Sequence, residues 1–243
     1  MVKPQIYKQI LSTKISIISL NDFLNYIFNQ ANSSVAVCNV NTVVTADKDF
    51  EFRTLINNFD LRIADGMPLV WYLKFNKIKQ ERMNGSKIFY KAIEAGLQRD
   101  TKHYFLGSSD EVLSKMILNL KDKYPELQIG GYFSPPIGTL NEIEEKTLMH
   151  LGDIEKCDIL WVGLGMPKQE KLISLLSNIK IVKIGVGAVF DWVAGTKKEA
   201  PKFIQNIGLE WLFRLLNEPK RLWRRYFYDF IYLIKKFFKF KKS

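Results

Sequence analysis

Short, mostly apolar runs alternate with longer amphipathic stretches along most of this 243-residue chain. The runs at residues 35–40, 157–162 and 179–186 are not divided into one polar and one apolar face. Such runs are typical of strands that helices cover on both sides of a sheet. Strands that alternate with helices favour a largely parallel sheet. We therefore predict an α/β fold with a Rossmann-like three-layer α/β/α body.

The same pattern predicts where the elements lie. We expect strands at residues 14–18, 35–40, 61–64, 102–106, 127–133, 157–162 and 179–186, and helices near 22–30, 42–58, 67–76, 85–98, 109–123, 141–152 and 167–178. The composition changes near Gly195, where glycine and lysine precede a basic, aromatic segment. We therefore divide the chain into a catalytic body, residues 1–195, and an amphipathic helical appendage, residues 196–243.

The appendage carries most of the net charge. Residues 196–243 hold thirteen Lys or Arg against four Asp or Glu, and the net charge of the whole chain is +11. An anionic membrane surface and nucleic acid are the partners that such a segment suits. Its longest nearly apolar stretch, residues 226–234, is interrupted by Asp229 and is far shorter than the roughly 20 residues of a spanning helix. We expect the appendage to lie on a membrane rather than to cross it.

Two other features suit a cytosolic protein. The N-terminal segment lacks a continuous apolar stretch, so no signal peptide is expected. Cys38 and Cys157 lie in apolar runs and are expected to be buried and reduced.

Open α/β sheets bind ligands beyond the carboxyl ends of their strands, so residues that follow strands are site candidates. Asp65 and Gly66 directly follow the strand expected at 61–64. Asp65 has two interpretations. It caps the next helix, with Pro68 in the first turn, or it is a carboxylate placed to accept a proton from an attacking hydroxyl.

A second candidate follows the strand at 157–162. Gly163 and Gly165 allow the backbone to approach a ligand closely, and Pro167 begins a helix whose free N–H groups suit a diphosphate. Lys168, followed by Gln169 and Glu170, stands where a dinucleotide-binding turn has its third glycine, which argues against a dinucleotide cofactor. In the alternative interpretation this is a plain turn, and Glu170 interacts with the helix dipole.

A third candidate follows the strand at 179–186. Gly187 and Asp191 line the same crevice in one interpretation, and in the other the glycine only permits a tight turn from strand to helix.

The sequence gives little support for a metal site or for a hydrolytic triad. His103 and His150 are far apart and have no acidic or cysteine cluster around them, which argues against a zinc site or a Ser-His-Asp triad. Asp47 and Asp49 have the Asp-x-Asp spacing of many metal-dependent sugar transferases. They fall in the middle of the helix expected at 42–58, so we interpret them as a solvated face and expect no metal site.

Six short segments together resemble the WecG/TagA/CpsF family of bacterial glycosyltransferases. They occur in the family order, and their combination is far more specific than any one of them. The segments are 41–46 (NTVVTA), 64–68 (ADGMP), 81–85 (ERMNG), 163–170 (GLGMPKQE), 185–191 (GVGAVFD) with Gly195, and 208–214 (GLEWLFR) followed by Glu218, Pro219, Arg224 and Arg225.

This resemblance implies an inverting, metal-independent transfer, without a cofactor, from a UDP-sugar to a polyprenyl-diphosphate-linked saccharide in cell-surface polysaccharide synthesis. It places the enzyme in the cytoplasm, peripherally on the inner face of the cell membrane. Asp65 is the implied general base, and Asn41, Arg82 and Gln169 match active-site positions. The implied substrate-binding set is Asn39, Gly66, Gly163, Gly165, Pro167, Lys168, Glu170, Gly187, Asp191, Arg214, Arg221 and Arg224.

Two positions depart from the family pattern. Asn39 stands where the family usually has threonine, and Glu199 replaces an arginine that usually precedes Ala200 and Pro201. The donor sugar stays open between an N-acetylmannosamine type and a hexose, and so does the oligomeric state.

The appendage suits the same function. Arg214, Arg221 and Arg224 have the spacing of one helical face, from which they are expected to reach the diphosphates. The cationic and aromatic residues of the segment favour binding in the plane of an anionic bilayer. Two alternatives remain: a basic nucleic-acid-binding protein, which lacks a recognised motif here, and a nucleotide-cofactor oxidoreductase, which lacks the third glycine.

Overall fold

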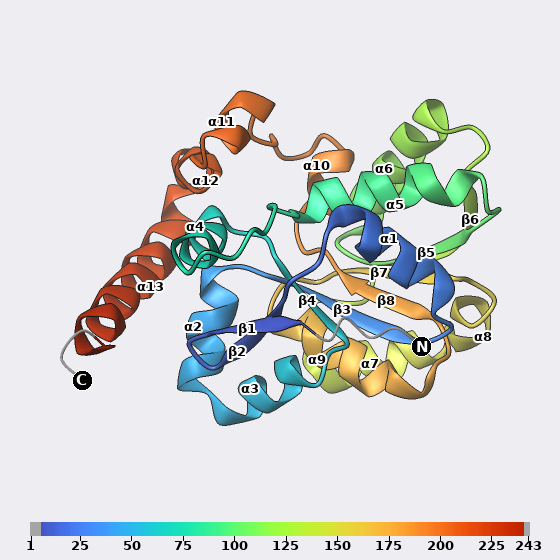
Figure 1. Ribbon diagram of the computed structural model, residues 1–243. Helices are drawn as coiled ribbons and strands as arrows, with labels where there is room; N and C mark the ends of the chain where they lie inside the picture. Colours follow the sequence, from blue (N-terminus) through green and yellow to red (C-terminus); the bar gives the residue numbers. More distant parts are fainter. Residues whose placement is uncertain (1–5, 241–243) are drawn as a thin grey trace.

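The structure is a computed structural model that describes residues 6–240, with side chains described up to residue 236. Its centre is a six-stranded sheet in the order β4-β3-β8-β7-β5-β6 (Figure 1). All neighbouring strands are parallel, which confirms the predicted fold class. The strands are β3 (Ser33–Cys38), β4 (Leu61–Ala64), β5 (Lys102–Gly107), β6 (Gln128–Phe133), β7 (Ile159–Gly163) and β8 (Val182–Gly185).

Each face of the sheet has its own apolar core. Along β7, Ile159 and Trp161 enter one core while Leu160 and Val162 enter the other, because successive side chains of a strand point to opposite faces. Helices cover both faces, above and below the sheet in Figure 1. One core receives α1 (Leu20–Asn29), α5 (Gly85–Leu97), α6 (Asp110–Lys123) and α10 (Val189–Val193), and the other receives α2 (Val40–Lys48), α3 (Phe50–Asn57), α4 (Met67–Phe75), α7 (Leu140–Leu148), α8 (Leu151–Ile154) and α9 (Lys168–Leu175).

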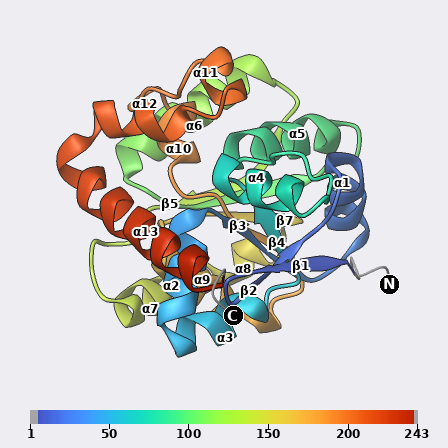
Figure 2. The same cartoon turned by 60° about the vertical axis from the view of Figure 1, so that its left-hand side comes forward.

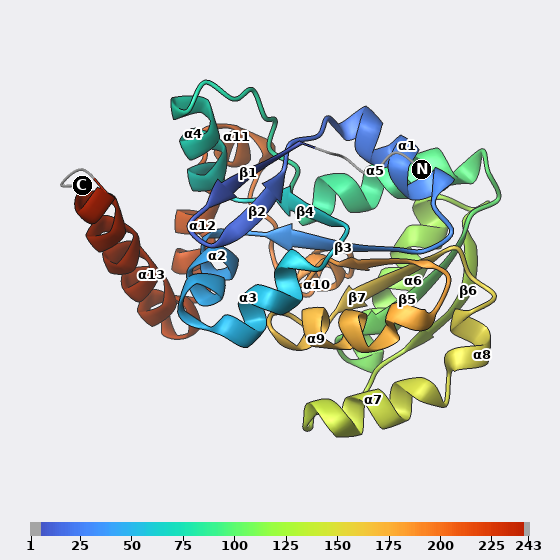
Figure 3. The ribbon, with the colours of Figure 1, turned by 60° about the horizontal axis from the view of Figure 1, so that its bottom comes forward.

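The first predicted strand does not join this sheet. Residues near 14–18 form β2 (Thr13–Ser16), which pairs with the unpredicted β1 (Tyr7–Ile10) in a separate antiparallel hairpin (Figure 3). The hairpin is joined to the edge strand β4, where the Arg62 backbone N–H donates to Ser16 Oγ at 3.1 Å. A short strand and a tight turn carry no signal for which sheet they will join, so only the tertiary structure reveals this.

Two predicted helices are broken. The helix expected at 42–58 is divided at Asp49, which ends α2 and caps α3 by accepting the Phe52 N–H at 3.0 Å. The helix expected at 141–152 is divided into α7 and α8, and the one near 167–178 ends as a 3-10 turn at Leu176–Asn178. Asp49 is therefore a capping residue between two helices, and the prediction that it lies in mid-helix is wrong.

The appendage consists of α11 (Lys202–Asn206), α12 (Glu210–Asn217) and α13 (Pro219–Phe240), with α13 running past α2 (Figures 1 and 2). Leu222 of α13 is completely buried, so this helix packs on the rest of the molecule. The chain turns between α12 and α13 at Glu218. The expected single helical face of Arg214, Arg221 and Arg224 is therefore wrong. None of the described helices combines the length and apolar character required to span a membrane.

Candidate active site

A cavity of about 350 Å³ lies at the carboxyl ends of β3, β4, β7 and β8. β3 and β8 are neighbours in the sheet. β4, the strand that follows β3 in the chain, lies on one side of this pair, and β5, β6 and β7 lie on the other side, so the strand order reverses between β3 and β8. Open α/β sheets bind ligands at such a reversal. The cavity brings together eleven of the predicted residues: Asn39, Asn41, Asp65, Gly163, Gly165, Gln169, Glu170, Gly187, Asp191, Arg214 and Arg221.

Five predicted residues do not line this cavity. Gly66 is the N-cap of α4, and the Lys168 ammonium is directed to the Gly138 carbonyl oxygen at 2.8 Å. Arg224 is exposed, with its guanidinium over the Trp223 ring. The remaining two are Pro167 and Arg82. For these five residues a role in substrate binding stays a prediction that the cavity does not support.

Asp65 is held at the end of β4 by the sheet. Its backbone N–H donates to the Cys38 carbonyl oxygen at 2.9 Å, which extends the pairing of β3 and β4 by one residue. Gly66 rather than Asp65 occupies the cap position, so the capping interpretation of Asp65 does not hold. The Asp65 side chain is 19% exposed. Its Oδ1 is buried and accepts no hydrogen bond from the residues that the structure describes.

The surroundings of Asp65 raise the pKa of its carboxyl group. Burial raises its pKa to about 6, and the carboxylate of Glu210 acts in the same direction. The guanidinium groups of Arg82 and Arg214 oppose the shift but do not cancel it. A carboxylate with a pKa near neutrality is a better proton acceptor than an ordinary aspartate.

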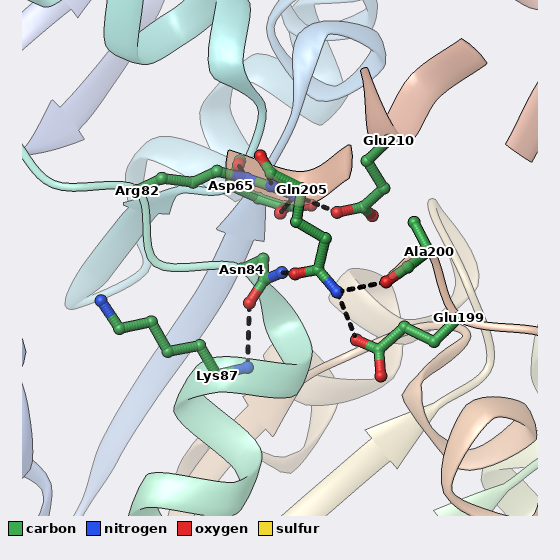
Figure 4. Close-up of polar contacts among 8 residues, drawn as sticks. All are labelled: Asp65, Arg82, Asn84, Lys87, Glu199, Ala200, Gln205 and Glu210. Carbon is green, nitrogen blue, oxygen red and sulfur yellow. Dashed lines mark hydrogen bonds and ion pairs between the residues drawn. The ribbon is translucent and has the colours of Figure 1, made fainter. Parts of the chain in front are cut away.

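The guanidinium of Arg82 forms hydrogen bonds and ion pairs with other groups of the protein. Its Nε donates to the Asp65 carbonyl oxygen at 2.6 Å, and its Nη1 donates to the Gln205 carbonyl oxygen at 3.4 Å. Its Nη2 contacts the carboxylate of Glu210 and lies 3.5 Å from Asp65 Oδ1 (Figure 4). The donors of Arg82 are thus directed to groups of the protein, and its predicted place among the active-site residues rests on its contact with Asp65.

Gln169 connects the loop that follows β7 to the loop that follows β8. Its Oε1 accepts the backbone N–H of Gly165 at 3.2 Å and that of Gly187 at 3.0 Å. Both glycines have a positive φ angle, +74° and +60°, which residues with a side chain rarely adopt. The Gly165 N–H, just before the predicted anion-binding helix start, is therefore bonded to a side chain of the protein. Gln169 shapes the wall between β7 and β8.

Glu170 is a second unusual carboxyl in the wall of the cavity. The Gln169 Nε2 donates to Glu170 Oε1 at 2.8 Å, and Glu170 Oε2 is buried without a hydrogen bond to any part of the chain that the structure describes. Burial raises the pKa of Glu170 to about 7. The helix-dipole interpretation does not account for this burial, so Glu170 remains a candidate for contact with a bound substrate.

The two asparagines after β3 have different tasks. Asn39 caps α2 by accepting the Thr42 N–H at 3.1 Å, and Thr42 closes the capping box in return. Asn41 is directed toward the appendage, where its Nδ2 donates to Asp229 of α13 at 3.4 Å. The appendage thus contacts the active-site end of the sheet directly.

Four cationic side chains contribute to the cavity wall: Lys197, Arg214, Arg221 and Arg225. Arg214 of α12 lies over the Trp192 ring at 5.2 Å. Arg221 is held by Glu218 at 2.7 Å. The Nε of Arg225 is buried and has no hydrogen-bond partner among the described atoms. These groups form a region that suits a multiply charged anion.

A model of the WecG/TagA/CpsF glycosyl transferase family matches residues 8–243. The chain belongs to this family. It is a glycosyltransferase, and membership implies sugar transfer to lipid-linked acceptors in surface-polysaccharide synthesis. The resemblance drawn from the six short segments is confirmed, and sugar transfer is favoured over the nucleic-acid and oxidoreductase alternatives.

Asp47 has a different task in this glycosyltransferase from the one its Asp-x-Asp spacing suggests. Its carboxylate accepts from Tyr232 at 2.6 Å and from Lys236 at 2.8 Å, both on α13, and also from Ser12. Burial alone raises the pKa of Asp47, but the hydrogen bonds from Lys236, Ser12 and Tyr232 outweigh it and lower the pKa to about 2. Among the residues that the structure describes, no three His, Cys, Asp or Glu side chains are grouped as metal ligands.

Sequence reasoning missed some residues of the site. The sequence favours Arg224, whereas Arg225 lies between the buried Leu222 and Asp229 at helical spacing. The sequence carries no signal for this choice, because an aspartate is ordinarily exposed and the burial of Asp229 is visible only in the structure. Glu210 and Gln205 were not singled out, and no local pattern marks them, because their partners Arg82 and Asn84 are distant in sequence. The two histidines stay outside the site, since His103 accepts from Trp161 and His150 is stacked on Phe133.

Proposed function

We propose that this glycosyltransferase transfers an N-acetylmannosamine-type sugar or a hexose from a UDP-sugar to a polyprenyl-diphosphate-linked saccharide. The transfer inverts the anomeric centre and uses no divalent metal ion, and the enzyme works at the inner face of the cell membrane. One observation carries the proposal. A partly buried carboxyl, Asp65, shares a cavity with the cationic side chains Arg214, Arg221, Arg225 and Lys197.

In the proposed reaction Asp65 acts as the general base. Its carboxylate accepts the proton of the acceptor hydroxyl while the hydroxyl oxygen bonds to the anomeric carbon. The bond from that carbon to the UDP oxygen breaks on the opposite side, and its electron pair leaves with UDP. Since the base must be deprotonated, activity is lost as the pH falls through the Asp65 pKa of about 6.

The leaving UDP needs positive charge and hydrogen-bond donors. Arginine suits this because its planar guanidinium donates two parallel hydrogen bonds to phosphate oxygens. Arg225 has a buried donor without a partner among the described atoms, and Arg214 and Arg221 line the same cavity. In our proposal these groups, together with Lys197, stabilise the diphosphate charge as it develops.

A direct test combines a panel of UDP-sugars with a polyprenyl-diphosphate-linked acceptor, assayed with and without EDTA. We expect one or a few donors to be turned over at equal rates in both conditions. Asp65→Asn should lower kcat at least about a thousandfold while UDP-sugar binding changes little, because the amide cannot accept the proton.

Asp122→Asn is the matched control, since Asp122 is exposed on α6, outside the cavity. It should retain full turnover. Substantial turnover by Asp65→Asn would remove the assignment of the base, and loss of activity in EDTA that a divalent cation restores would remove the metal-independent mechanism.

A further inference from the structure

Glu210 connects the appendage to the carboxyl that we assign as base. It is the first residue of α12, and its side chain is only 12% exposed. Its carboxylate contacts Arg82 Nη2, the same nitrogen that lies 3.5 Å from Asp65 Oδ1. One guanidinium thus serves two carboxylates, one from the body and one from the appendage (Figure 4).

The neighbouring contacts fix this arrangement in place. Gln205 of α11 accepts from Arg82 through its carbonyl oxygen and from Asn84 Nδ2 through its side chain at 3.0 Å. The Gln205 Nε2 in turn donates to the Ala200 carbonyl oxygen at 2.7 Å. The start of the appendage is therefore bonded to the loop that carries Arg82, so Arg82 is held where both carboxylates reach it.

The charges around Asp65 come from two places. Arg82 comes from the loop before α5, and Glu210 and Arg214 come from α12. Cys38, which ends the adjacent strand β3, adds no charge, because burial raises the pKa of its thiol. A guanidinium that is shared with a second carboxylate stabilises the charge of the first one less, and the second carboxylate adds repulsion. Both effects favour proton uptake by Asp65.

We propose that Glu210 is a positioning residue that makes Asp65 an effective base by drawing the Arg82 guanidinium toward the docked appendage. The proposal rests on the proposed role of Asp65 in transfer. It gives the appendage a task besides anion binding. Without Glu210 in place, Arg82 pairs with Asp65 and leaves a more weakly basic carboxylate.

The test measures Asp65 directly and needs no turnover. The carboxyl carbon of Asp65 is titrated by NMR in protein with carbon-13-labelled aspartate, and its signal is assigned by its loss in Asp65→Asn. In Glu210→Gln we expect the Asp65 titration midpoint to fall by at least about one pH unit. The acidic limb of the kcat/KM profile should move in the same direction.

Two further variants separate charge from packing. Glu218→Gln removes an equal charge from the same appendage, where Glu218 pairs with Arg221, and should leave the Asp65 midpoint in place. Glu210→Asp keeps the charge and should also keep the midpoint near its wild-type value. An unchanged midpoint in Glu210→Gln, or an equal fall in Glu210→Asp, would overturn the proposal. Turnover by Asp65→Asn would instead overturn the role of Asp65 as base, which the titration does not depend on.

Discussion

At the scale of single residues, Arg224 and Arg225 are adjacent in the chain but have different surroundings. Arg225 lines the cavity, and its Nε is buried without a hydrogen-bond partner in residues 6–236. Arg224 is exposed over Trp223, which is itself 50% exposed. Adjacent residues of a helix are about 100° apart, so one of the pair faces the body when the other faces outward. We expect them to serve two different anions.

A matched pair of variants checks this difference. Arg225→Ala should raise the KM for the UDP-sugar roughly ten- to hundredfold, since a charged hydrogen bond to phosphate contributes about 1.5–3 kcal/mol. Arg224→Ala should leave that KM within about twofold and weaken binding to anionic vesicles by about 1 kcal/mol. Steady-state kinetics with a detergent-solubilised acceptor and vesicle sedimentation measure the two effects. Equal effects of both variants on KM would contradict the assignment.

The residue types that follow the predicted strands indicate in the sequence where the site lies. Asp65 was identified because it directly follows a strand and because that position in an α/β sheet faces the ligand. Gln169 was also identified, but its contacts were not, since the N–H groups of Gly165 and Gly187 that it joins belong to different loops. The sequence indicates which residues surround a site, whereas bonds between loops depend on the tertiary arrangement.

At the scale of elements, α13 is the helix whose placement matters most. It is fixed to α2 at two points: Asp229 with Asn41, and Tyr232 and Lys236 with Asp47. The first point lies in the cavity wall and the second lies at the far end of α2. Two anchors along a helix fix its direction as well as its position, which keeps Arg221 and Arg225 at the cavity.

Removal of the second anchor tests this. Asp47→Ala should let trypsin trim the appendage about five- to tenfold faster, because it removes a partly buried ion pair and hydrogen bonds worth about 1 kcal/mol or more. Limited proteolysis followed by mass spectrometry measures the rate.

Asp49→Ala serves as the matched control. It removes a carboxylate two residues away that accepts from Phe52 and caps α3. It should lower global stability by about 1 kcal/mol without faster trimming of the appendage. Trimming at the wild-type rate in Asp47→Ala would show that this contact does not hold α13.

At the scale of the whole molecule, α13 has two different faces. Leu222 and Asp229 face the body, while Trp223, Phe227, Phe230 and Ile234 recur every three or four residues along the exposed side. Lys220, Arg224 and Lys235 are also exposed. We infer that this side enters the interfacial layer of an anionic bilayer, where apolar and basic groups act together. The cavity then lies close to the membrane-held acceptor.

The double variant Phe227→Ser/Phe230→Ser should bind anionic vesicles at least about tenfold more weakly, since each buried phenyl ring contributes about 2 kcal/mol. Turnover of a detergent-solubilised acceptor should be nearly unchanged, because neither side chain lines the cavity. Leu118→Ser on α6 is the control, an equally exposed apolar residue in the body. Unchanged vesicle binding by the double variant would show that this face does not contact the membrane.

The sequence by itself determined the six strands of the main sheet, most of the helical segments between them, the polar residues at the strand ends and the family. These are local properties, because the period of apolar residues and the motif at each strand end depend only on residues that are close together in the chain. Only the tertiary structure decided that β1 and β2 leave the main sheet, that α12 and α13 are separate, that Asp47 holds α13, and that Glu210 shares Arg82 with Asp65. Each of these depends on side chains far apart in the chain, and such pairings exist only once the elements have packed.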